Sequence, residues 1–215
     1  MSLQAFEKSL TPAERVFMDS LDSPRKIQDF LDEVVYEPEY FNRCPLRVLR
    51  ERRGHCFDGA LFGALALSRL GHPPVIVDLL PAPLMDDDHV LALFRQNGGL
   101  GAVAKSNTSG LRFRDPVYRG ARELVMSYFE DYYNTLGLKS LRGYTLPFNL
   151  RPLGGINWTV DDAGCDAIEH MFGDLPRRML LTPEMARSLS KVDKRAFDAG
   201  LLGADPAGLY APGIA

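Results

Sequence analysis

Apolar residues are spaced in different ways along the chain, and each spacing predicts a different kind of element. Helix starts are marked by Thr11-Pro12 and Ser23-Pro24, each followed by apolar residues at helical intervals. Residues 59–67 are apolar or small at every position, which predicts a helix buried on all sides. This helix is expected to end near Gly71, because Pro73-Pro74 cannot continue it.

Three β-branched and apolar runs follow the buried helix and predict a small antiparallel sheet. The first strand covers residues 75–80, the second residues 89–94, and the third residues 100–106. Asn97-Gly98-Gly99 is a strong hairpin signal between the last two strands. A three-residue loop here would place Asn107 opposite the first residue of the second strand. A two-residue turn would place Ser106 there, although a bulge could restore the pairing with Asn107.

Helical patterns return after the sheet. Residues 118–134 carry apolar side chains at helical spacing, and this stripe is typical of a core-facing helix. A short helix is expected around residues 162–172. Thr182-Pro183 begins a late helix that is expected to run to about residue 199, where Gly200 can end it.

The order of these elements predicts one α+β domain spanning residues 1–215. A buried helix packs on a small antiparallel sheet, with extra helices on the N-terminal and C-terminal sides. The expected parts are a core (residues 45–135), a C-terminal helical extension (136–203) and a surface tail (204–215).

Composition and charge narrow the function classes. The chain has 215 residues, 46% of them hydrophobic and 25% charged, which fits one globular domain. A net charge of −3 provides no basic field for nucleic acid, and no apolar run is long enough to cross a membrane. We find no secretory signal and expect a cytoplasmic protein. Three cysteines are too few for a disulfide framework, and no metal or cofactor motif is present.

The segment from Arg53 to Asp58 places Cys56 at the start of the buried helix. Unpaired N–H groups and the positive end of the helix dipole meet at such a position. Both favour a thiolate, and the same N–H groups can bind an oxyanion. The alternative is a small apolar residue that packs the helix start.

A cysteine nucleophile needs an imidazole as its base, and the chain has four histidines. His55 adjoins Cys56 but cannot face it on a helix, while His72 lies past the far end of that helix. His170 lies on the short later helix. His89 starts a strand two connections after Cys56, which makes it the candidate base, with a structural role as the alternative.

Asn107 is the candidate third residue, because the three-residue loop would place it opposite His89 on the same face of the sheet. The alternative for Asn107 is an ordinary turn residue. Its rival, Asp115, precedes Pro116 and has a sufficient structural role at the start of the following helix.

Residues 45–107 resemble the transglutaminase-like superfamily, a branch of the papain-like fold. The resemblance rests on the motifs Pro45-Leu46-Arg47-Val48-Leu49, Arg53-Gly54-His55-Cys56-Phe57-Asp58-Gly59-Ala60, Leu70-Gly71-His72-Pro73-Pro74 and Asp88-His89. It implies a Cys-His-Asp/Asn triad with Cys56 as nucleophile, His89 as base and Asn107 as the orienting residue. Arylamine N-acetyltransferases resemble the cysteine motif as well.

The resemblance implies acyl transfer through a thioester, either hydrolysis of an amide or peptide bond or transamidation. The expected partner is a peptide or a small amide or acyl substrate, without cofactor or metal. An acetyltransferase and a catalytically inactive binding domain are the alternatives. A solvated turn is the preferred interpretation of the acidic run Asp86-Asp87-Asp88, with a calcium-binding loop as the alternative. A solvated helix face is likewise the preferred interpretation of the arginines near Cys56, with a binding site for an anionic substrate group as the alternative. These arginines are Arg47, Arg50, Arg52 and Arg53.

Overall fold

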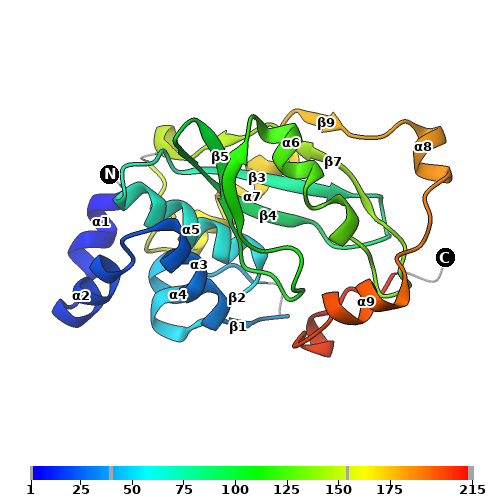
Figure 1. Cartoon of the computed structure of the whole chain (residues 1–215). Helices are drawn as coiled ribbons and strands as arrows, with labels where there is room; N and C mark the ends of the chain where they lie inside the picture. Colours follow the sequence, from blue (N-terminus) through cyan, green and yellow to red (C-terminus); the bar gives the residue numbers. More distant parts are fainter. Residues whose placement is uncertain (1, 39–40, 154, 213–215) are drawn as a thin grey trace.

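The computed structural model of the chain describes residues 2–38, 41–153 and 155–212 (Figure 1). The helical elements are α1 (Ser2–Ser9), α2 (Pro12–Ser20), α3 (Pro24–Glu33), α4 (Pro45–Glu51), α5 (Cys56–Arg69), α6 (Ala121–Met126), η1 (Phe129–Asp131), η2 (Arg151–Leu153), α7 (Asp162–Gly173), α8 (Pro183–Arg187), α9 (Lys194–Gly200) and η3 (Pro206–Gly208). The strands are β1 (Val35–Tyr36), β2 (Arg53–Gly54), β3 (Val75–Pro81), β4 (His89–Gln96), β5 (Gly99–Val103), β6 (Arg114–Tyr118), β7 (Leu141–Thr145), β8 (Phe148–Asn149) and β9 (Arg177–Met179).

The main sheet is antiparallel, with strand order β6-β5-β4-β3-β7-β9, and β8 pairs with part of β3. The α+β class expected from the sequence is therefore confirmed, although the sheet extends beyond the three strands that the pattern predicted. A separate two-residue parallel pair joins β1 to β2, so that Tyr36 lies beside Gly54, two residues before Cys56.

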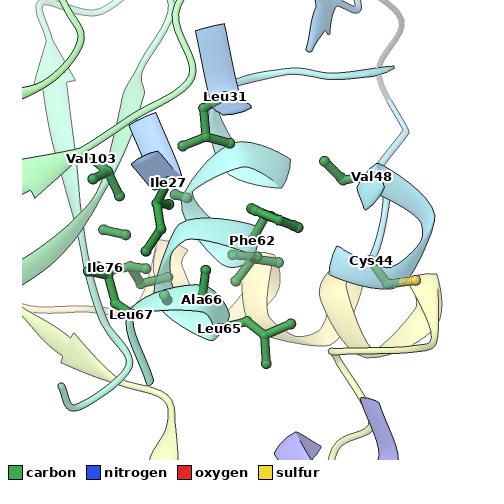
Figure 2. Packing of buried hydrophobic residues seen from close by; sticks show 14 of the residues in the cluster. Ile27, Leu31, Cys44, Val48, Phe62, Leu65, Ala66, Leu67, Ile76 and Val103 are labelled. Atoms are coloured by element: carbon green, nitrogen blue, oxygen red, sulfur yellow. The ribbon is translucent and has the colours of Figure 1, made fainter. Parts of the chain in front are cut away.

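Side chains on the two faces of the main sheet belong to two different hydrophobic clusters. In β4, Val90 and Ala92 join the cluster that contains α5, whereas Leu91 and Leu93 join the cluster that contains α6. Figure 2 shows part of the α5 cluster, including Phe62. Both faces of the sheet are therefore covered, and β4 is buried between the layers.

Two glycines let α5 lie unusually close to the sheet. A Cβ atom on Gly59 would lie 2.2 Å from the Lys105 Cβ, and one on Gly63 would lie 2.8 Å from Cγ2 of Val103. Any larger side chain at either position would push the helix away. This close approach brings the start of α5 to the level where β4 begins.

The β4–β5 hairpin corrects the expected register. Gln96 pairs with Gly99, which leaves a two-residue turn in which Asn97 has φ 50° and Gly98 has φ 84°. The three-residue loop was wrong because Gly99 belongs to the strand: a Cβ there would lie 1.7 Å from the carbonyl oxygen of Pro116. This glycine provides room for β6.

The helices after the sheet differ from their predicted lengths. Residues 118–134 were expected to form one helix, but they contain the end of β6, then α6 and η1. The late helix is divided into α8 and α9, because Ser188 ends the first and Asp193 caps the second with its side chain. Within the described residues, no helix has both the length and the apolar character that a membrane span requires.

Candidate active site

Cys56 is the first residue of α5, and a buried carboxylate shapes the chain around it. Asp58 is fully buried and accepts hydrogen bonds from the main-chain N–H of Arg43 (2.7 Å) and of His55 (3.2 Å). Desolvation raises the pKa of Asp58 to about 7, while these N–H donors act against that rise. Asp58 thus ties the start of α5 to the segment before α4.

The Cys56 thiol lies against the main chain at the start of β4. Its Sγ is 3.8 Å from the carbonyl oxygen of Asp88, the residue before His89. The main-chain N–H of Val90, the residue after His89, also points to the sulfur. The sulfur therefore lies beside the peptide groups that flank His89.

The imidazole of His89 is held from its far side by a carbonyl group. Its Nε2 lies 2.7 Å from the main-chain oxygen of Leu111, and the side chain is almost fully buried. A carbonyl oxygen only accepts, so Nε2 carries the hydrogen and Nδ1 is left as an acceptor. None of the hydrogen bonds found among the described residues joins Cys56 to His89.

Two neighbouring cavities meet at Cys56. The larger has a volume of about 910 Å³, and its walls include Asp78, Asp88 and Val90. The smaller has a volume of about 80 Å³ and is lined by both Cys56 and His89. Cys56 therefore borders both cavities, and His89 borders the smaller one.

The electrostatic environment of the pair corrects the expectation of a thiolate. Desolvation raises the pKa of the Cys56 thiol well above its ordinary value, and the carboxylates of Asp88 and Asp87 raise it further. Desolvation also lowers the pKa of His89 to about 4, although the Leu111 carbonyl opposes this. In this structure the pair is a neutral thiol and a neutral imidazole at pH 7, because burial disfavours the charged form of each group.

None of the hydrogen bonds found among the described residues joins Asn107 to His89, although both residues border the smaller cavity. Its amide nitrogen donates to the carbonyl oxygen of Asp205 (2.8 Å), and its oxygen accepts from the Asp205 N–H (2.9 Å). The expected position opposite His89 depended on the three-residue loop, and pairing of β4 with β5 ends at Ala92 and Val103. The contact that orients His89 comes instead from Leu111.

Asp115 does not begin a helix, as the sequence analysis expected. It lies within β6, and Gly120 is the residue before α6. The structural role assigned to Asp115 was therefore wrong in kind, because the chain stays extended through Pro116 and pairs with β5.

The other candidate residues have local partners. Nδ1 of His170 donates to the Asp166 carbonyl, 2.7 Å away, and His55 lines the larger cavity. Each arginine near Cys56 is paired with a carboxylate, as a solvated helix face would be: Arg47 with Glu51 and Asp162, Arg50 with Glu14, Arg52 with Glu33 and Arg53 with Glu37. Among the described residues, no cluster of three or more His, Cys, Asp or Glu side chains is arranged to hold a metal ion.

Several residues of the site were missed by the sequence analysis. Asp78 is almost fully buried in β3 and lines the larger cavity, and its Oδ1 has no hydrogen-bond partner among the described residues. A lone aspartate inside the apolar run 75–80 was the available signal. Tyr132 donates to the carbonyl of Asp87 (2.7 Å) and so fixes the loop before His89, but its helical spacing marked it only as core.

The fold and site define an α+β protein with a cysteine at the start of a buried helix and a histidine at the start of the adjacent strand. No family model matches the chain, and no curated protein sequence matches it. Among solved structures it is distantly similar to Legionella pneumophila LapG, with TM-score 0.36 and 16% identity over 49% of this chain and 71% of that one. For the EGTA-treated form of LapG the TM-score is 0.40, with 14% identity over 78% and 98% of the two chains.

Proposed function

We propose that this protein is a cysteine-dependent acyl-transfer enzyme that cleaves an amide or peptide bond through a thioester on Cys56. The observation that carries this proposal is the position of the Cys56 sulfur. It lies 3.8 Å from the Asp88 carbonyl, beside the main chain of His89, and both residues border the smaller cavity. Within the part of the chain that the structure describes, no hydrogen bond to Nδ1 of His89 is found, which leaves this nitrogen as the acceptor that a general base requires.

In the first step, Cys56 attacks the substrate carbonyl as its proton moves to Nδ1 of His89. The S–C bond forms, and the carbonyl π electrons move onto oxygen. The tetrahedral intermediate then collapses: the C–N bond breaks, and the leaving nitrogen takes the proton from His89. An amine departs, and a thioester remains on Cys56.

In the second step, water attacks the thioester and gives its proton to His89. The C–S bond breaks, the sulfur takes the proton back, and a carboxylic acid leaves. An amine in place of water would give a new amide, which is transamidation. Both outcomes use the same two side chains and leave the enzyme unchanged.

The start of α5 supplies donors for the developing oxyanion. The first N–H groups of a helix have no partner within the helix, and Cys56 is the first helical residue. The imidazolium that forms in each step donates from Nε2 to the Leu111 carbonyl. This contact stabilises the positive charge of the His89 ring during the part of each step in which Nδ1 holds the transferred proton.

A catalytically inactive binding domain is the second candidate, and one observation favours it. The thiol of Cys56 is neutral at pH 7, since burial and nearby carboxylates raise its pKa. In a binding domain, the role of such a cysteine would be to pack the start of α5.

Mass spectrometry of an acyl-enzyme tests these proposals against each other. The intact protein is mixed with activated amide, ester and acyl-CoA donors and quenched in acid. We expect an added acyl mass on Cys56 that decays in water and decays faster with an added primary amine. The adduct should be absent from Cys56→Ala. If no donor acylates Cys56, while a small molecule still binds the larger cavity, the binding-domain candidate replaces the enzyme.

A further inference from the structure

The C-terminal segment of the chain lies over the candidate active site. Ala207 and Ala211 line the larger cavity, and the residues between them, Gly208, Leu209 and Tyr210, line both cavities together with Cys56. The segment therefore forms a shared wall between the two cavities. The surface tail expected from the sequence is a covering of the site.

The groove binds this segment through its main chain. The side-chain amide of Asn107 forms two hydrogen bonds with the N–H and C=O of Asp205. The hydroxyl of Thr135 donates to the Tyr210 carbonyl (3.3 Å). Contacts to main-chain atoms are available to any polypeptide of the right shape, so they are the basis of peptide recognition.

The path of the segment is narrow at one position, and this position limits which residue of the segment can occupy it. Gly208 lies between Tyr36 and Asn107, and a Cβ atom at this position would be 2.5 Å from Cδ1 of Tyr36 and 2.9 Å from Nδ2 of Asn107. Gly208 also ends the short η3 turn, and Leu209 continues in an extended conformation. A chain can follow this path only with glycine in the passage.

The element before the segment is held independently. The hydroxyl and N–H of Ser109 donate to the carbonyls of Ala199 and Gly200, and Tyr133 donates to the Ala196 carbonyl (2.9 Å). α9 can therefore stay docked when the last residues leave. The segment after it is the part that can exchange.

We propose that this groove is a polypeptide-binding site that requires glycine between Tyr36 and Asn107, and that residues 205–211 of this chain are its intramolecular occupant. This proposal names the substrate class of the proposed enzyme. It depends on the proposed function for the reaction at Cys56, but not for the binding of a polypeptide. A polypeptide substrate would have to displace the segment before its carbonyl reaches Cys56. The segment thus competes with substrate at the same groove.

The test measures access to Cys56 in the full chain, without any turnover. Gly208→Val should expel the segment, and Gly120→Val is the matched control, since a Cβ on Gly120 meets nothing within 4 Å. We expect a bulky maleimide to label Cys56 about tenfold faster in Gly208→Val, because two hydrogen bonds and the glycine contact hold the covered state. The control should label at the wild-type rate. Equal rates in all three proteins would overturn the proposal.

A peptide added to Gly208→Val tests the glycine requirement. The heptapeptide Asp-Pro-Ala-Gly-Leu-Tyr-Ala should restore slow labelling, and the same peptide with valine for glycine should not. Equal protection by both peptides, or by neither, would overturn the proposal. If Gly208→Val fails to fold, Asn107→Ala removes the two Asp205 hydrogen bonds and takes its place in the labelling measurement, where faster labelling than wild type is again expected and an unchanged rate would overturn the proposal.

The two proposals can fail separately. Protection by the glycine peptide without any acyl-enzyme on Cys56 leaves the binding groove and removes the enzyme. An acyl-enzyme without protection by the peptide leaves the enzyme and removes the groove.

Discussion

Nε2 of His89 is held 2.7 Å from the main-chain carbonyl oxygen of Leu111. A backbone carbonyl thus makes the contact that a side-chain amide or carboxylate was expected to make. The ring is fixed in one tautomer without an added charge, so burial, together with the neighbouring carboxylates, still raises the pKa of the Cys56 thiol.

His89 should remain in the Nε2–H tautomer when Asn107 is changed. The Leu111 carbonyl is the acceptor, while the Asn107 amide is bonded to Asp205. Nitrogen-15 NMR of the histidine ring distinguishes the two tautomers. A change of tautomer in Asn107→Ala would return the orienting role to Asn107.

Cys56 should be the first cysteine to react with a small alkylating reagent. Cys44 and Cys165 are buried, and burial raises the pKa of the Cys44 thiol to about 12. Peptide mapping after partial labelling identifies the site. Cys165→Ala serves as the control, since it should leave labelling of Cys56 unchanged while it lowers the melting temperature. Preferential labelling of Cys44 would contradict the greater accessibility of Cys56, which is only partly buried.

Removing one acidic neighbour should make Cys56 more reactive. The Asp88 carboxylate raises the pKa of the thiol, so Asp88→Asn should lower that pKa and increase the thiolate fraction at pH 8. Each unit by which the pKa falls gives about a tenfold faster alkylation. The rate is measured against pH, with the exposed Asp22→Asn as control. A profile identical to wild type would mean that the carboxylate of Asp88 does not act on the sulfur.

Acid should destabilise the fold through His89. Its folded-state pKa of about 4 lies below the ordinary value of 6.5, because the ring is buried in its neutral form. This contribution to stability is present in full above pH 6.5 and is lost as the pH falls through 4. The difference corresponds to about 3 kcal/mol of unfolding free energy.

Urea unfolding at several pH values measures this loss. His89→Gln should reduce the fall in unfolding free energy between pH 6.5 and 4. Part of this fall should remain, because desolvation also lowers the pKa of His55 to about 4. His170→Gln, at an exposed position, should leave the fall unchanged. An unchanged fall in His89→Gln would show that this ring is not what titrates.

Gly59→Ala should destabilise the protein by about 1–3 kcal/mol, the usual cost of overpacking a tight contact. The new Cβ would lie 2.2 Å from that of Lys105. Gly173→Ala in α7 is a matched control, because its Cβ meets nothing within 4 Å and should be neutral or stabilising. Equal unfolding midpoints for the two variants would disprove the close approach of α5.

Local signals in the sequence predicted much of this fold. The capping box at Thr11 and the proline at the start of α3 are both found, and the wholly apolar run became α5 with Cys56 as its first residue. His89 begins a strand, as predicted. These features depend on neighbours a few residues apart, so a single sequence contains the information for them.

Long-range contacts account for what the sequence did not predict. Gly99 looked like a third loop residue because nothing nearby shows that β6 passes over it. The Leu111 carbonyl is a main-chain atom, and any residue type could supply it. The C-terminal segment has an ordinary turn composition, and only the fold brings it to Cys56.

The glycine face of α5 has a mechanical consequence. Where Gly59 and Gly63 meet the sheet, the helix backbone rests directly on Lys105 and Val103, with no flexible side chain of its own in between. The distance from helix to sheet here therefore depends on the side chains of Lys105 and Val103 and on no side chain at positions 59 and 63 of the helix. Side-chain fluctuations elsewhere in the core, such as at Leu61 or Leu65, can then occur without carrying the sulfur away from the strand that holds its base.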